Sequence, residues 1–192
     1  MIFRPSARIR VETERLVLRP PEHRDWREWS ELRASSEAFL KPWEPVWASD
    51  HLSRRAFSGR VHWARRAIGQ GSALPLLVHR KGGGIVGAVT LDNVRRGPAQ
   101  AASMGYWLGE AETGKGYMTE ALPAVVHYAF REMDLSRIEA ATLEENRPSR
   151  RLLARIGFRE EGVAQAYLQI AGRWRAHILH ARLRPDRVGR AV

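Results

Sequence analysis

The stretch Thr113-Gly114-Lys115-Gly116-Tyr117-Met118-Thr119 joins an apolar, aromatic segment, residues 104–108, to a helical pattern that runs from Ala121 to Phe130. Glycine lets the backbone approach a ligand closely, and the first N–H groups of a helix have no partner inside it. A strand, a glycine-rich turn and a helix start therefore predict a phosphate-binding site. Because many loops contain two glycines, this prediction needs support from elsewhere in the chain.

A second pair of polar residues follows in the segment 145–158. Asn146 and Ser149 are three positions apart, so they share one face of a helix if both are helical. Pro148 is acceptable in the first turn of such a helix. Taken alone, these residue types favour a plain structural interpretation, in which Asn146 caps the helix and the Ser149 hydroxyl faces solvent.

Composition limits the classes of protein that this chain can form. It has 192 residues, 44% of them hydrophobic, which is enough for one domain with a full core. The absence of cysteine excludes disulfides, thiolate metal sites and a cysteine nucleophile. The histidines are scattered, and we expect no metal site. No apolar run reaches membrane-spanning length and no apolar signal core begins the chain, so we expect a cytoplasmic protein without a membrane segment.

The net charge of +11 fits an acidic partner such as RNA, a ribosomal surface or a phosphorylated cofactor. Nearly all the basic residues are arginine, however, and an arginine bias can equally reflect genome composition. The arginines are also spread along the chain without a block interleaved with aromatic residues. We therefore do not expect nucleic-acid binding to be the main function.

The elements that must position these residues alternate between helical and strand patterns. We expect one α/β domain over residues 1–184, with a loose basic lead over 1–10 and a basic flexible tail over 185–192. The predicted strands are 16–19, 73–80, 85–94, 101–108 and 137–142. Strand structure is expected to return from Phe158 onward and to end in a hairpin of 167–170 and 174–183. The predicted helices are 22–35, 53–70, 115–133 (kinked at Pro123) and 148–156, and two prolines make 40–47 a rigid aromatic loop.

The ordered set of motifs resembles the GNAT superfamily of N-acetyltransferases over residues 11–184, and within it the RimJ-type ribosomal-protein-alanine N-acetyltransferases. The resemblance rests on Leu40-Lys41-Pro42-Trp43-Glu44-Pro45, residues 113–121, Asn146-x-x-Ser149, Ile156-Gly157-Phe158-x-Glu160-Glu161-Gly162 and Trp174-x-x-His177-x-Leu179. It implies an α/β (α+β) fold: a mixed, mostly antiparallel central sheet with splayed central strands, flanked by helices.

The chain departs from the family pattern at four positions. Many members of the superfamily have Gln or Arg where Thr113 stands, and Gly or Ala where Met118 stands. The RimJ-type group often has an acidic residue before Tyr167 and another before His177, where this chain has Ala166 and Ala176. Any substrate contact or base function of those acids is absent here.

The resemblance implies acetyl-CoA as co-substrate and no metal. It places the pyrophosphate on backbone N–H groups of Gly114, Lys115, Gly116, Tyr117, Met118 and Thr119. The pantetheine arm is expected along Tyr106, Trp107 and Leu108 like an added strand, with a backbone N–H near Leu108 polarising the thioester carbonyl. The resemblance also implies that Asn146 binds a pantetheine amide. It implies that Ser149 acts on the departing sulfur as a hydrogen-bond donor or proton relay.

The proton acceptor is assigned to Glu44, because the fold places its rigid loop over the acceptor side; Glu120, Glu144 and Glu145 are the alternatives. For Glu120, a partnership with the helix dipole is the stronger interpretation. Trp43, Trp47 and Tyr167 are expected to form walls of the acceptor channel, with core packing as the alternative. Core packing is expected for Trp26, Trp29, Trp63 and Trp107.

The sequence therefore predicts transfer of an acetyl group to a protein N-terminal α-amine, as in the ribosomal-protein-alanine type, with a small-subunit ribosomal protein as partner. An α-amine with a pKa near 7.7–8 is far more often neutral at pH 7.5 than a lysine near 10.4. With no cysteine available, direct attack in a ternary complex is expected. Two alternatives stay open: a small-molecule acetyltransferase acting on an aminoglycoside, polyamine or amino acid, and a non-catalytic ribosome- or RNA-binding protein. The chain is expected to be a monomer or a homodimer.

Overall fold

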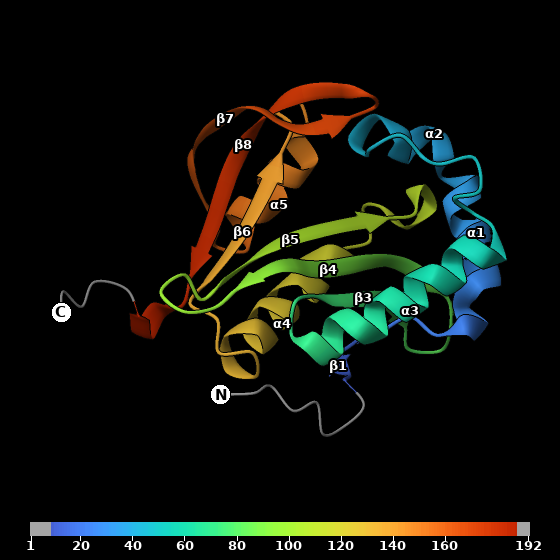
Figure 1. The fold of residues 1–192 in the computed structure, drawn as a ribbon, viewed down its shortest axis with the longest axis horizontal. Helices are drawn as coiled ribbons and strands as arrows, with labels where there is room; N and C mark the ends of the chain where they lie inside the picture. Colours follow the sequence, from blue (N-terminus) through green and yellow to red (C-terminus); the bar gives the residue numbers. More distant parts are fainter. Residues whose placement is uncertain (1–8, 188–192) are drawn as a thin grey trace.

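A computed structural model describes residues 9–187, which form one eight-stranded sheet with helices on both faces (Figure 1). The strand order is β1-β2-β3-β4-β5-β6-β8-β7. The strands are β1 (Val11–Glu12), β2 (Leu16–Arg19), β3 (Leu74–Arg80), β4 (Ile85–Arg95), β5 (Ala101–Leu108), β6 (Arg137–Thr142), β7 (Arg159–Ile170) and β8 (Arg173–Leu183). The α-helices are α1 (Trp26–Ser35), α2 (Glu37–Leu40), α3 (Arg54–Gln70), α4 (Tyr117–Arg131) and α5 (Arg147–Arg155), and short 3-10 turns cover His23–Asp25, Lys41–Trp43, Glu110–Glu112 and Pro185–Arg187.

The central strands β5 and β6 are parallel, whereas every other neighbouring pair in the sheet is antiparallel. Their pairing covers only Ala101–Ser103 against Arg137–Glu139. Beyond that point the two strands separate, as Figure 1 shows, while each keeps its antiparallel neighbour on the other side. This confirms the predicted mixed, mostly antiparallel sheet with splayed central strands.

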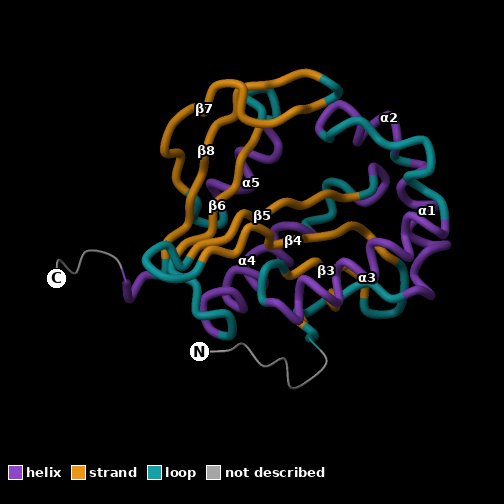
Figure 2. The backbone as a smooth tube through the Cα atoms, in the orientation of Figure 1, coloured by secondary structure: helices purple, strands orange, loops and turns teal. Residues whose placement is uncertain are grey.

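Helices lie on both sides of the sheet (Figure 2), and two apolar clusters hold them against it. Helix α4 buries Met118, Leu122 and Val125 in the larger cluster, which also contains side chains from β2 to β6. On the other face, Trp29 of α1 and Phe57 of α3 pack on β3 and β4 in the smaller cluster. Among the core tryptophans that we predicted, Trp29 is 4% exposed, but Trp63 is 40% exposed and does not belong to the core.

The predicted boundaries agree closely with the observed ones where a turn residue marks the end of an element. Strands β2, β5 and β6 match the expected ranges. Ser53 caps α3 by accepting a hydrogen bond from the Ala56 N–H at 3.1 Å, and Gly71 ends this helix with a φ of 66°. Helix α4 continues through Pro123. Strand β7 begins at Arg159, next to the expected return to strand structure at Phe158, and runs without a break to Ile170.

The C-terminal segment differs from the expected flexible tail as far as the structure describes it. Residues Pro185–Arg187 form a 3-10 turn. Arg184 donates to the Asp134 carboxylate at 2.8 Å, and Arg187 pairs with the same carboxylate. Residues 188–192, and residues 1–8 of the expected basic lead, lie outside the described part of the chain. Within residues 9–187, no helix combines the length and apolar character needed to cross a membrane.

Candidate active site

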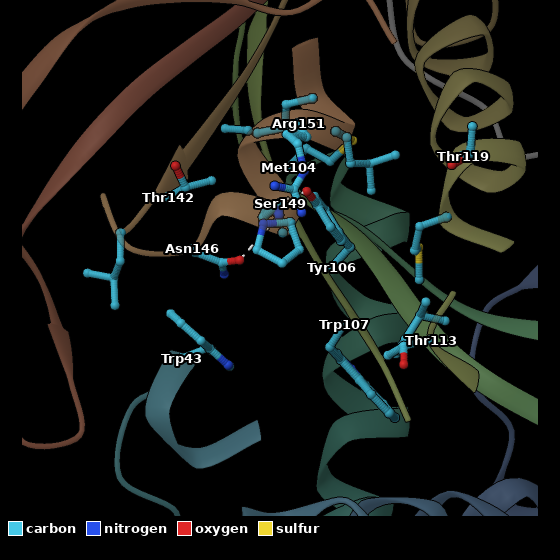
Figure 3. Close-up of a pocket in the computed structure, with 18 of the residues that line it drawn as sticks. Trp43, Met104, Tyr106, Trp107, Thr113, Thr119, Thr142, Asn146, Ser149 and Arg151 are labelled. Carbon is cyan, nitrogen blue, oxygen red and sulfur yellow. Dashed lines mark hydrogen bonds between the residues drawn. The ribbon is translucent and has the colours of Figure 1, made fainter. Parts of the chain in front are cut away.

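A cavity of about 650 Å³ opens where β5 and β6 separate. The beginning of α4, the helix α5 and the segment around Trp43 close it on its other sides. Predicted site residues that line it are Trp43, Glu44, Tyr106, Trp107, Leu108, Gly114, Gly116, Tyr117, Met118, Thr119, Asn146 and Ser149. Figure 3 shows Tyr106, Asn146 and Ser149 in one part of this cavity and Thr113 and Thr119 in another.

The glycine-rich turn enters α4 in a backbone conformation that favours glycine. Gly114 has a φ of 73°, and Gly116, at the N-cap position of α4, has a φ of 79°. Both values lie in the left-handed region, where a side chain causes strain. The start of α4 lines the cavity with Gly116, Tyr117, Met118 and Thr119. Lys115 does not line the cavity, and its Nζ pairs with Glu112 at 2.9 Å.

Glu120 fastens the turn before β2 to α4. Its carboxylate accepts hydrogen bonds from the backbone N–H of Arg15 at 2.7 Å, from Arg15 Nε at 2.6 Å and from the Thr13 hydroxyl. These contacts give Glu120 a structural role in the first turn of α4. Glu144 and Glu145 do not line the cavity, and Glu145 pairs with Arg175.

Ser149 forms a hydrogen bond with the side chain of Tyr106, a residue that was predicted to contribute only backbone groups. Its Oγ lies 2.6 Å from the hydroxyl of Tyr106. Burial raises the pKa of Tyr106 to about 12, so the phenol stays protonated near neutral pH. Asn146 Oδ1 accepts a hydrogen bond from the Ser149 backbone N–H at 3.2 Å and thus caps α5. The Asn146 amide nitrogen remains a donor beyond that cap.

Two arginines on α5 line the same cavity and were not predicted as site residues. Arg151 and Arg155 are exposed, lie one helical turn apart, and have no acidic partner among the described residues. They give the rim a positive charge that suits a phosphate group. The two arginines are four residues apart in the predicted helix after Pro148, and this spacing places them on one face. The spacing could have indicated a charged site, but the many other arginines of the chain made it hard to distinguish.

Glu44 is held by a buried arginine. Arg33 is 4% exposed and donates to both carboxylate oxygens of Glu44, with an Nη1–Oε1 distance of 2.8 Å. The Trp47 indole N–H donates to the same carboxylate at 2.7 Å. The Arg33 guanidinium lies over the rings of Trp47 and Trp107, 4.4 and 4.6 Å from their centroids. Its Nε is buried without a partner.

His51 completes this cluster on the side of α3. Its two ring nitrogens lie 3.1 Å from Arg33 and from Arg60. Burial, together with the charges of Arg60 and Arg33, lowers the pKa of His51 from 6.5 to about 4, so the ring is neutral near pH 7. Trp47 stacks on His51 with centroids 4.4 Å apart and does not line the cavity. Its position matches the alternative role in packing.

Tyr167 does not line this cavity. It is 44% exposed and meets the ring of His177 edge to face at 5.8 Å. His177 is buried and does line the cavity, although the sequence analysis gave it no role. Within residues 9–187, no group of three His, Cys, Asp or Glu side chains is arranged to hold a metal ion.

Comparison with known proteins agrees with this geometry. The model of the acetyltransferase (GNAT) domain matches residues 15–159. The [Ribosomal protein uS5]-alanine N-acetyltransferase of Escherichia coli (strain K12) is 38% identical over 180 residues, which cover 93% of each chain. A probable N-acetyltransferase of Bacillus subtilis (strain 168), YjcK, is 45% identical over 102 residues, covering 53% of this chain and 56% of the relative.

Two solved structures superpose on most of the chain. RimJ of Mycobacterium smegmatis, in complex with CoA-disulfide, has a TM-score of 0.84 and 35% identity, covering 91% of this chain and 84% of that one. The ribosomal-protein-S5-alanine acetyltransferase of Vibrio fischeri has a TM-score of 0.86 and 29% identity, covering 93% and 98%. The chain therefore belongs to the acetyltransferase (GNAT) family, as an N-acetyltransferase that uses acetyl-CoA.

Proposed function

We propose that the protein transfers the acetyl group of acetyl-CoA to the N-terminal α-amine of a protein, in the manner of the ribosomal-protein-alanine N-acetyltransferases. The observation that carries this proposal is the single cavity that joins a glycine-rich helix start to the Tyr106–Ser149 pair through the gap between β5 and β6. Its shape and chemistry suit a long thioester with a phosphate at one end. The extended similarity to the uS5-alanine enzyme of Escherichia coli supports the choice of acceptor.

Coenzyme A would occupy this cavity from the start of α4 inward. The N–H groups of residues 114–119 would bind the pyrophosphate, with help from the helix dipole. Lys115 would contribute through its backbone, since its side chain pairs with Glu112. The pantetheine arm would lie along the free edge of β5 at Tyr106, Trp107 and Leu108, where the separation from β6 leaves room for an added strand. Asn146 would donate from its amide nitrogen to a pantetheine carbonyl.

The leaving thiolate would be met by Ser149. As the amine attacks the thioester carbon, the C–S bond breaks and negative charge develops on the sulfur. A hydroxyl donor placed there stabilises that charge and supplies a proton. The protonated phenol of Tyr106 would donate to Ser149 Oγ and direct the serine hydrogen toward the sulfur.

Attack would be direct within a ternary complex, because the chain has no cysteine to form a thioester intermediate. An α-amine suits this site, since its pKa near 8 leaves a sizeable neutral fraction at neutral pH. Trp43 would line the cofactor cavity, and Tyr167 would stand at the outer edge of the acceptor path. A ribosomal-protein acceptor would place the reaction in the cytoplasm.

The position of Glu44 in the loop 40–47 predicts it as the proton acceptor. Its contacts in the structure favour a positioning role instead. A guanidinium that is almost fully buried donates to both carboxylate oxygens of Glu44, and the Trp47 indole donates to one of them as well. The pair with Arg33 and the bond from Trp47 hold the loop 41–47 against α1. Glu44 would therefore fix the loop that carries Trp43 at the side of the cofactor cavity.

Thiol release from acetyl-CoA tests the acceptor class. We would compare an Ala-starting peptide, the same peptide with a blocked α-amine and free lysines, and a polyamine. Turnover with the free N-terminus alone is the expected result. Turnover with the polyamine alone would move the protein to small-molecule acetylation. Tight acetyl-CoA binding without any turnover would contradict the proposed acceptor.

A further inference from the structure

A second cavity, of about 290 Å³, meets the first at the point where β5 and β6 part. The two cavities share Met104 and Gly105 of β5 and Ala140 and Ala141 of β6. The second is otherwise lined by Ser103 of β5 and by residues of β4, β6, β7 and β8, with no residue of α4 or α5. A group that enters through this cavity would therefore arrive beside the inner end of the first one.

Asp92 and Ser103, two polar residues of the second cavity, lie on the sheet face away from α4. Met104 and Tyr106 of β5 pack in the cluster that contains α4. Because side chains alternate along a strand, Ser103 and Gly105 face the other way. Asp92 pairs directly with Ser103 across β4 and β5, so the two share a face. A shift in register between Asp92 and Arg95 and a φ of 48° at Asn93 end the regular pairing just beyond Asp92.

Asp92 differs from the other charged groups around this cavity. On β6, Glu139 pairs with Arg95 and Arg137, and Arg137 also pairs with Glu161. His180 of β8 lies 2.9 Å from the Thr142 hydroxyl, and Tyr167 of β7 is the remaining titratable group. Among the described residues Asp92 has no ion-pair partner, and its recorded side-chain contact is a 3.4 Å hydrogen bond from Asn93 Nδ2. Burial raises the pKa of Asp92 above 3.8.

We propose, on the basis of the function proposed above, that the second cavity admits the acceptor α-amine and that Asp92 receives its proton. The amine nitrogen forms the new bond to the thioester carbon, and the C–S bond breaks with its electron pair on sulfur. The amine proton passes to the Asp92 carboxylate, directly or through one water, and the thiolate takes its proton from Ser149. Tyr167 and Leu168, carried over the cavity by the irregular stretch of β7 between Ala164 and Leu168, border the entrance.

The pH dependence of Asp92→Asn tests the proton acceptor. With the Ala-starting peptide we expect kcat/KM to fall about 100-fold at pH 7, the scale of general-base catalysis. The loss should shrink as the pH rises toward 9, because the peptide amine then loses its proton to water. The Kd of acetyl-CoA, measured by calorimetry, should stay within about twofold of the parent value, which also shows that the variant folds.

Matched carboxylates separate this role from a structural one. Glu139→Gln removes an ion-paired acid of the same cavity, and Glu44→Gln removes the acid held by Arg33; both should lower the rate without changing the shape of the pH profile. A parent-like profile for Asp92→Asn would overturn the proposal, and a changed profile for Glu44→Gln would return the base to Glu44. The two proposals can fail independently. The acceptor assay on the parent protein tests the proposed function, and the Asp92→Asn comparison is then made with the acceptor that the parent acetylates.

Gly105→Val tests the route of entry. Gly105 has no atom within 4 Å of a built Cβ, and its backbone is outside the left-handed region, so a side chain can begin there without backbone strain. A side chain there would fill the junction of the two cavities. We expect KM for the peptide to rise at least tenfold with acetyl-CoA binding retained. An unchanged KM would rule out entry through this junction.

Discussion

The pair of hydroxyls at Tyr106 and Ser149 is the smallest unit of the site for which the structure defines a geometry. The spacing from Asn146 predicts Ser149 as a site residue, whereas Tyr106 is predicted only as a strand residue whose backbone binds pantetheine. The 2.6 Å contact joins them from β5 and α5. Burial keeps the Tyr106 hydroxyl protonated, with a pKa of about 12, so the tyrosine can donate and leave the serine hydrogen for the sulfur.

If the two hydroxyls act as one unit, their removal should not be additive. Ser149→Ala and Tyr106→Phe should each lower kcat, the first by roughly 10- to 100-fold and the second by about tenfold. The double variant should be no slower than Ser149→Ala, because the tyrosine acts only through the serine. Steady-state kinetics with all four proteins measures this, and the Kd of acetyl-CoA should stay nearly constant.

Additive losses in that cycle would mean that Tyr106 supports the reaction by a separate route. A large loss of acetyl-CoA affinity in Ser149→Ala would instead assign Ser149 to cofactor binding. The peptide acceptor must be saturating in these assays, so that changes in its binding do not enter kcat.

At the scale of elements, the site depends on how closely β4 and β5 approach each other. Gly87 of β4 pairs with Leu108 of β5. A Cβ built on Gly87 would lie 2.1 Å from the backbone oxygen of Trp107 and 3.1 Å from the Leu108 Cα. Both neighbours are backbone atoms, so they cannot move without displacing the strand. The other edge of β5 at these residues is the one assigned to pantetheine.

Gly87→Ala should therefore damage both stability and cofactor binding. We expect a loss of about 1–3 kcal/mol, as for other overpacked sites, and a Tm lower by roughly 2–12 °C. The Kd of acetyl-CoA should rise, because β5 must shift. Gly59→Ala on the exposed face of α3 is the control; its Cβ meets no atom within 4 Å, and alanine favours a helix, so Tm should rise slightly. An unchanged Tm for Gly87→Ala would contradict the rigid approach of the two strands.

Local patterns predicted the elements well, and they could not predict which elements meet. Alternation and turn residues located β5, β6 and α3 almost to the residue. The ion pair of Arg33 with Glu44 joins two segments whose relative position no local rule gives. The second cavity depends on β5 and β6 being neighbours, and on the register that sets Asp92 opposite Ser103. The resemblance supplied the cofactor residues, whereas it gave no signal for Asp92.

Across the whole molecule, three buried or half-buried histidines share one response to acid. Burial is the main cause that lowers the pKa values of His51, His79 and His180 below 6.5, and the value for His51 is about 4. They lie in separate places: beside α1 and α3, on β3, and on β8. The carboxylates with lowered pKa values, such as Glu145 and Glu161, are protonated only below their ordinary value of 4.5. The histidines therefore dominate the interval above pH 4.5.

Stability should fall as the pH falls from 6.5 toward 4.5. In that interval the unfolded chain binds protons at these histidines and the folded chain binds fewer, so stability rises with pH. The His51 contribution should be lost progressively until its folded pKa of about 4 is reached. Urea unfolding at several pH values measures the slope. His51→Gln should flatten it, and a slope equal to that of the parent would exclude His51 as a source of the acid sensitivity.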